Sequence, residues 1–163
     1  MWKPCLIALA FFAWPAVGNA SALSDQVLGI HNAERALVGE APLTWSEKLS
    51  ADAQVWADHL AATGKFYHDP ENAYEGENLS AGGKDAFSTA QLTQLWADEK
   101  PGFKPGVFPD VSTDGNWATV GHYTQMIWRG TTEVGCAQST GDSFDFLVCR
   151  YSAAGNVMGE SVY

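Results

Sequence analysis

The chain has 163 residues, 46% of them hydrophobic and 17% charged, so it is long enough to bury a core and is neither disordered nor of low complexity. Nine basic residues against nineteen acidic ones give a formal charge of −10. A surface this acidic repels phosphate groups, which excludes nucleic acid as a partner and argues against docking on anionic membranes.

The first 22 residues have the pattern of a secretory signal peptide. Lys3 supplies the basic start, the apolar run of residues 6–14 is too short to span a bilayer, and Ala20-Ser21-Ala22 fits an A-x-A cleavage site. An uncleaved membrane anchor is the alternative. We expect a mature domain of residues 23–163 that is secreted or periplasmic, with no stable membrane anchor after cleavage.

Helical periodicity predicts three helices in the mature chain. They span about residues 25–38, 47–62 and 89–99. The predicted N-terminal caps are Ser24 for the first helix, a capping box of Thr44 and Glu47 for the second, and a capping box of Ser88 and Gln91 for the third.

Glu99 has an unusual place at the end of the third predicted helix. It follows Leu92, Leu95 and Trp96 by seven, four and three residues, so it shares a face with three apolar side chains. The pattern therefore predicts a carboxylate on a buried helix face.

The second half of the chain carries the strand signals. We expect strands at residues 77–80, 133–138 and 144–152, while residues 122–128 fit either a short helix or a strand. Residues 101–118 are rich in Gly and Pro and predict a long loop. Helices followed by antiparallel strands indicate an α+β layered domain.

Cys136 and Cys149 are the two cysteines of the expected mature chain. They lie in the last two predicted strands, on either side of a turn sequence, and an even cysteine count in an exported protein predicts a disulfide. A bridge closing so short a loop contributes about 3 kcal/mol in the chain-entropy model. A thiol nucleophile or a metal-binding pair is the alternative.

Four histidines are candidates for chemistry, and their settings differ. His31 lies near the apolar stripe of the first helix and is interpreted as a structural residue, and His59 is interpreted as solvated. His68 follows the second helix and His122 follows the long loop.

Two carboxylates in unusual positions join this pair of histidines. Glu77 begins an apolar strand, and Glu99 lies on a face that should be buried. Two imidazoles and two carboxylates can form a divalent-metal or acid/base site. Scattered structural polar groups are the alternative, because neither His68 nor His122 belongs to a local metal motif.

Other functional motifs are missing from the sequence. It has no G-x-S-x-G elbow, P-loop or G-x-G-x-x-G turn. Asn78-Leu79-Ser80 matches a glycosylation sequon, but its place in a predicted strand argues against modification.

Short motifs along the whole mature chain resemble the CAP superfamily of cysteine-rich secretory proteins, antigen 5 and pathogenesis-related proteins of group 1. The matching segments are His31-Asn32-Ala33-Glu34-Arg35, Gly76-Glu77-Asn78-Leu79, Leu95-Trp96-Ala97-Asp98-Glu99, Gly121-His122-Tyr123-Thr124-Gln125 with Trp128, and the two segments around Cys136 and Cys149.

The resemblance implies an α–β–α sandwich with a small antiparallel sheet between helical layers, and a short helix at residues 122–128. It also implies that His68, Glu77, Glu99 and His122 converge in one cleft, where the two histidines can bind a divalent cation such as zinc.

Two classes of function follow from these expectations. The first is a secreted binding protein for a small apolar ligand, a lipid or a protein partner, with Phe103, Val107 and Phe108 of the long loop, or a groove between helices, as the apolar contact. The alternative for these loop residues is that the aromatic side chains anchor the loop to the core. The alternative is a metal-dependent hydrolase, a peptidase or a cell-wall enzyme, with Glu77 or Glu99 as general base. The ligand count favours binding over catalysis, because catalytic zinc has three protein ligands.

Overall fold

The computed structural model describes residues 18–163, so most of the predicted signal peptide, including Cys5, lies outside the described residues. The elements are α1 (Gly18–Leu37), β1 (Thr44–Trp45), α2 (Glu47–Thr63), β2 (Gly76–Gly83), α3 (Thr89–Ala97), α4 (Gly121–Met126), β3 (Glu133–Thr140) and β4 (Phe144–Ser152), with 3-10 turns at Lys100–Gly102 and Trp117–Thr119.

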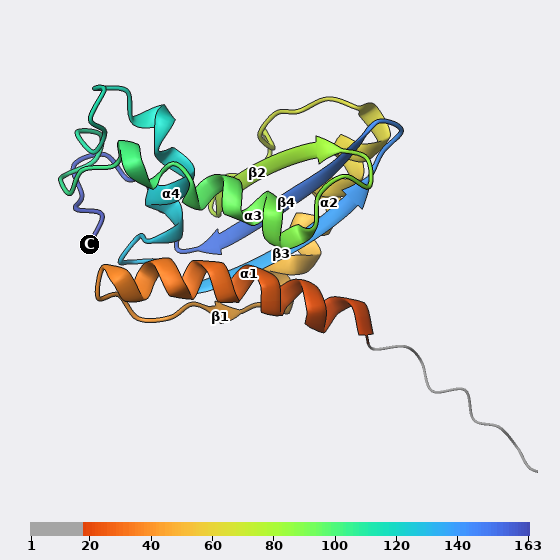
Figure 1. Ribbon diagram of the computed structural model, residues 1–163, viewed down its shortest axis with the longest axis horizontal. Helices are drawn as coiled ribbons and strands as arrows, with labels where there is room; N and C mark the ends of the chain where they lie inside the picture. The colour runs from red at the N-terminus through yellow and green to blue at the C-terminus, as the bar shows by residue number, and fades with distance from the viewer. Residues whose placement is uncertain (1–17) are drawn as a thin grey trace, which may run out of the picture.

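The strands form one sheet in the order β1-β3-β4-β2 (Figure 1). β4 pairs antiparallel with both β3 and β2, as the sequence predicts. β1 pairs parallel with β3 over two residues, and so short a strand was not predicted. β2 therefore lies at one edge of the sheet.

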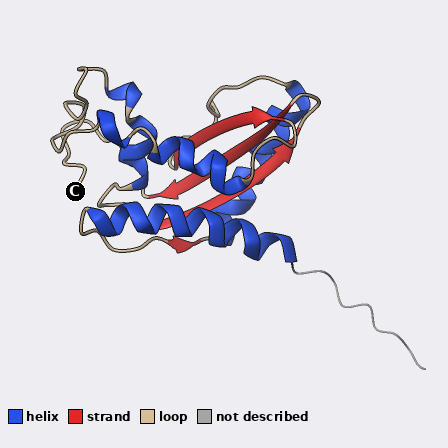
Figure 2. Ribbon diagram, viewed as in Figure 1, coloured by secondary structure: helices blue, strands red, loops and turns tan. Residues whose placement is uncertain are grey.

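Helices cover both faces of this sheet, which confirms the α+β sandwich (Figure 2). α2 packs on one face, and α1, α3 and α4 lie on the other. The core is divided accordingly. The α2 side is filled by Ala53, Trp56, Ala57, Leu60, Leu79, Ala137, Phe146 and Val148, and the opposite side includes Val27, Leu92, Trp96, Tyr123, Met126, Leu147 and Tyr151.

The helix boundaries follow the predicted pattern, with corrections at the starts of α1 and α2. α1 begins at Gly18, so Ser24 lies inside the helix and is not its cap; Ala20, Ala22 and Leu23 before it are good helix formers. The predicted Thr44–Glu47 capping box is wrong, because Thr44 belongs to β1. The N-cap of α2 is Ser46, whose side chain makes no capping hydrogen bond. The capping box at the start of α3 is confirmed.

α3 ends at Ala97, two residues before the predicted end, and Glu99 lies just beyond it. Leu92 and Trp96 are buried as predicted, but Leu95 is 45% exposed. The prediction that Glu99 lies on a buried helix face is therefore wrong. Glu99 is a half-buried residue at the turn that follows α3.

The long loop is anchored to the core by its own apolar residues. Phe108 is 1% exposed and Val111 is buried, and Phe103 packs against the rings of Tyr123 and Tyr163. Of the three loop residues expected to contact a ligand, only Val107 is well exposed. For Phe108 the structure supports the alternative, in which the aromatic ring anchors the loop to the core.

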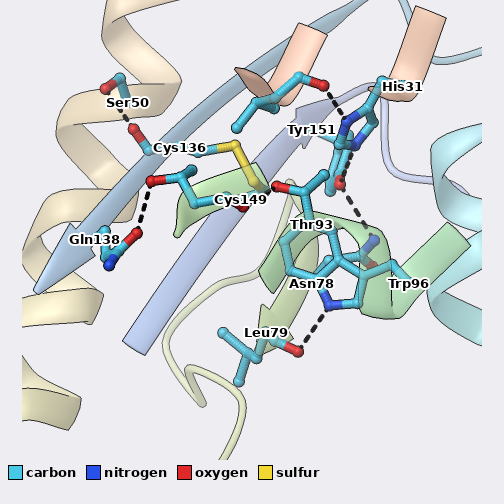
Figure 3. Close-up of a disulfide and its surroundings, with 12 residues drawn as sticks. His31, Ser50, Asn78, Leu79, Thr93, Trp96, Cys136, Gln138, Cys149 and Tyr151 are labelled. Atoms are coloured by element: carbon cyan, nitrogen blue, oxygen red, sulfur yellow. Dashed lines mark hydrogen bonds between the residues drawn. A yellow bond between two sulfur atoms is a disulfide. The ribbon is translucent and has the colours of Figure 1, made fainter. Parts of the chain in front are cut away.

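Cys136 and Cys149 form the predicted disulfide across β3 and β4 (Figure 3). The two residues are direct partners in the strand register. Both are buried, which excludes the alternative of a free nucleophilic thiol. In the described part of the chain, no helix is long and apolar enough to cross a membrane.

Candidate functional site

His68 and Glu77 form the first of two histidine–carboxylate pairs. His68 lies in the segment after α2 and Glu77 in β2, and the ring Nδ1 is 2.5 Å from Glu77 Oε1. The backbone N–H of Asp69 donates to the same oxygen. The Glu77 side chain is only 5% exposed, and the buried guanidinium of Arg150 lies 3.1 Å from its Oε2. This cation compensates the buried carboxylate.

His122 and Glu99 form the second pair at the start of α4. The His122 Nδ1 is 2.6 Å from Glu99 Oε1, and Glu99 Oε2 accepts the backbone N–H groups of His122 and Tyr123, each at 3.0 Å. The indole of Trp96 stacks on the His122 ring with centroids 6.3 Å apart. The turn after α3 thus fixes the orientation of an imidazole on α4.

Both pairs define the protonation of the rings in the same way. A carboxylate only accepts hydrogen bonds, so the Nδ1 atoms of His68 and His122 carry the proton. In the neutral form of each ring, the lone pair is therefore on Nε2. Carboxylates that bind the second ring nitrogen orient metal-binding histidines in this manner.

Three of the four predicted residues line one cavity of about 190 Å³, namely His68, Glu77 and His122. Glu99 contacts His122 from outside this cavity and lines a neighbouring groove. The wall of this cavity also includes three residues that were not predicted as site residues, namely Asn78, Trp117 and Asn156.

The donor set suits a weakly held cation. Across residues 18–163, no group of three or more His, Cys, Asp or Glu side chains is arranged to hold a metal ion. The fitting donors are the Nε2 atoms of His68 and His122, and solvent would supply the other ligands. Both carboxylates are already bound to imidazole and backbone N–H groups, which limits them as general bases.

A buried hydrogen-bond chain supports this site from behind, and the sequence did not predict it (Figure 3). The Asn78 amide donates to the backbone carbonyl of His122 and to the Tyr151 hydroxyl, both at 3.1 Å. The hydroxyl therefore donates to His31 Nε2 at 2.8 Å, and His31 Nδ1 donates to the Val27 carbonyl. The sequence indicated no hydrogen-bonding role for Asn78, and its burial agrees with the expected lack of glycosylation.

The remaining histidines have the predicted roles. His31 is fully buried, and its desolvation lowers its pKa to about 4. Burial also raises the pKa of Tyr151 well above its ordinary value, so the hydroxyl stays protonated. His59 is exposed, stacks on Trp56, and its Nε2 lies 2.6 Å from the Tyr67 hydroxyl.

A larger apolar groove of about 470 Å³ adjoins the cavity. His122 lines both, because its ring stands between them. The groove lies between α3, the edge of β2 and the segment after α2. Its lining is mostly apolar and consists of Gly64, Phe66, Leu79, Ser80, Ala81, Leu95, Trp96, Phe144 and Phe146, with Glu99 and His122 as polar members.

These features define an α–β–α sandwich with two histidine–carboxylate pairs beside an apolar groove. A family model described as "Cysteine-rich secretory protein family" matches residues 28–151. The chain therefore belongs to the CAP family of cysteine-rich secretory proteins.

Curated relatives support this assignment. The chain is 38% identical to Pathogenesis-related protein 1A of Nicotiana tabacum over 137 residues, which cover 83% of this chain and 78% of that protein. It is 36% identical to Protein PRY2 of Saccharomyces cerevisiae over 140 residues, covering 84% of this chain and 39% of the yeast protein.

Solved structures show the same fold. NaASP2, solved with Zn²⁺, aligns with a TM-score of 0.75 at 23% identity and covers 93% of this chain and 90% of its own. BmVAL-1 aligns with a TM-score of 0.72 at 25% identity, covering 93% and 86% of the two chains.

Proposed function

We propose that this protein is an exported binding protein whose cleft holds a divalent cation between His68 and His122 and accepts an apolar ligand beside it. The observation that carries the proposal is the pairing of each Nδ1 with its own carboxylate. This leaves two imidazole lone pairs for one cation. The NaASP2 relative, solved with Zn²⁺, makes zinc the first cation to test.

A bound cation would supply a Lewis acid and a point of positive charge in the cleft. The residues of this chain orient the two rings by binding each Nδ1, and hold Glu77 against Arg150. A metal-dependent hydrolase is the weaker candidate, because catalytic zinc has three protein ligands and this site offers two histidines. Loss of a hydrolytic activity on changing both histidines to alanine would be needed to support it.

The test is a calorimetric zinc titration of the metal-stripped mature protein near neutral pH. We expect a one-site isotherm that is lost in His122→Ala. The matched control is His59→Ala, which removes an exposed imidazole outside the cavity and should leave binding unchanged. Equal binding by both variants, or none by the wild type, would overturn the proposal.

A further inference from the structure

The apolar groove follows the free edge of the sheet. β2 has β4 as its one neighbour in the sheet, so its other edge faces the groove. Leu79, Ser80 and Ala81 come from both faces of β2, and all three line the groove. The groove therefore wraps around the strand edge itself, with α3 on one side and Phe66 on the other.

The strand register fixes which backbone groups point outward. The ladder with β4 continues beyond β2 through Lys84 N–H and the Ser143 carbonyl at 2.9 Å. Because antiparallel pairs alternate, Ser80 and Gly82 also bond to β4, and Leu79 and Ala81 direct their N–H and C=O groups to the open edge. The Trp96 indole confirms this direction, since it donates to the Leu79 carbonyl at 3.0 Å (Figure 3).

Ala81 consequently presents an unused donor and an unused acceptor. Among the described residues, no hydrogen bond reaches its N–H or C=O group from the open side. Ser80 adds a second sign of an incomplete site. Its hydroxyl is buried, lines the groove and has no partner within residues 18–163. A buried hydroxyl without a partner costs about 1–3 kcal/mol, which a ligand can relieve.

Beyond Glu77, this edge also lacks the protection that edge strands normally carry. Lysine, proline and inward-pointing charges usually prevent a further strand from pairing. Residues 78–83 read Asn-Leu-Ser-Ala-Gly-Gly and contain none of them. The small side chain of Ala81 allows another backbone to approach this edge closely.

We propose that an extended peptide binds in this groove as an additional strand on β2. Its backbone pairs with Ala81, and its apolar side chains pack on Leu95 on one face and on Phe66 and the aromatic residues of β4 on the other. The proposal names the ligand class of the proposed binding function and rests on it, but it requires no metal.

The two ends of the groove specify the side chains of the peptide. The register places Phe144 beside Gly83 and Phe146 beside Ala81, so one end is aromatic. The other end holds Glu99 and His122, next to Asn78. Three strand residues, or about 10 Å, separate Asn78 from Ala81. Because the net charge of this protein is −10, we expect the preferred peptide to carry a basic residue two to four positions from an apolar residue.

The first experiment screens capped hexapeptide pools, each with one fixed residue, against the mature protein in EDTA. We expect pools with fixed Phe, Leu, Lys or Arg to bind. Leu95→Glu places a charge on the exposed wall of the groove and should weaken binding at least tenfold. Leu37→Glu is the matched control, because Leu37 is exposed at the far end of α1. No pool binding above the Leu95→Glu level would overturn the proposal.

The second experiment tests strand pairing directly on the selected peptide. N-methylation should weaken binding at least tenfold at alternate residues, and the Ala81 amide should become protected from hydrogen exchange in the complex. Uniform tolerance of N-methylation, or an Ala81 amide that stays unprotected, would show that the groove takes side chains alone and would refute the added strand. Because EDTA is present, loss of zinc binding in the separate titration leaves this result interpretable.

Discussion

His31 should make the protein sensitive to mild acid. Its ring is fully buried between α1 and β4, where it accepts from the Tyr151 hydroxyl and donates to the Val27 carbonyl. Protonation would put a hydrogen on the nitrogen that accepts, and would place a cation near buried Arg35. Desolvation is the larger effect, and together they lower the pKa of His31 from 6.5 to about 4.

The size of the effect follows from linkage. In the unfolded chain His31 binds a proton below pH 6.5, while in the fold it stays neutral until about pH 4. The contribution of neutral His31 to the free energy of unfolding is therefore fully present above pH 6.5. It falls by about 1.4 kcal/mol per pH unit as the pH drops from 6.5 to about 4. The total loss by pH 4 is about 3 kcal/mol, a large part of the stability of a small domain.

The assay combines urea denaturation between pH 7.5 and 4 with an NMR titration of the imidazole resonances. His31→Gln removes the titrating group and should flatten the pH dependence relative to wild type. The NMR measurement needs no variant, and should show that His31 stays neutral through pH 5. A His31 resonance that titrates near pH 6.5 would refute the reasoning.

Two further predictions concern the stability of the fold, one through buried hydrogen bonds and one through helix packing. Arg35 donates to four backbone carbonyls, so Arg35→Met should lower the free energy of unfolding by about 3–5 kcal/mol, whereas Arg129→Met at an exposed ion pair should change it by under 1 kcal/mol in the same urea titration. Gly135→Ala would place a Cβ 2.2 Å from the Ser50 backbone nitrogen and should strongly lower the melting temperature, while Gly29→Ala meets no atom within 4 Å and should raise it slightly. Equal melting temperatures for the two alanine variants would contradict this account of how α2 packs on β3.

Local chemistry explains what the sequence predicted correctly. The stripe of α2, the Gly64 stop with its φ of 64°, and the Ser88–Gln91 capping box all depend on residues within one or two turns. The disulfide was also predictable, because the turn between the cysteines sets the β3–β4 register and places them opposite each other. Such features need no information from distant parts of the chain.

The missed features depend on distant contacts. Glu99 was expected on a helix face, but its carboxylate accepts the first N–H groups of α4, and no local pattern links residue 99 to residues 122 and 123. Helical periodicity predicted that Leu95 is buried, but it is 45% exposed, because periodicity does not show how far the neighbouring elements cover a helix face. β1 was not predicted, because its two residues pair with a strand almost ninety positions later in the sequence.

The register of β2 against β4 accounts for most of the site at once. It places Glu77 directly opposite Arg150, which neutralises the carboxylate that holds His68. It puts Asn78 on the opposite face, where its amide reaches both Tyr151 and the His122 carbonyl. A slip of one residue would exchange these faces, burying Glu77 beside α4 and turning Asn78 toward Arg150. The disulfide fixes β4 in the sheet at Cys149, the direct register partner of Asn78, so this bond helps to keep both histidines in place.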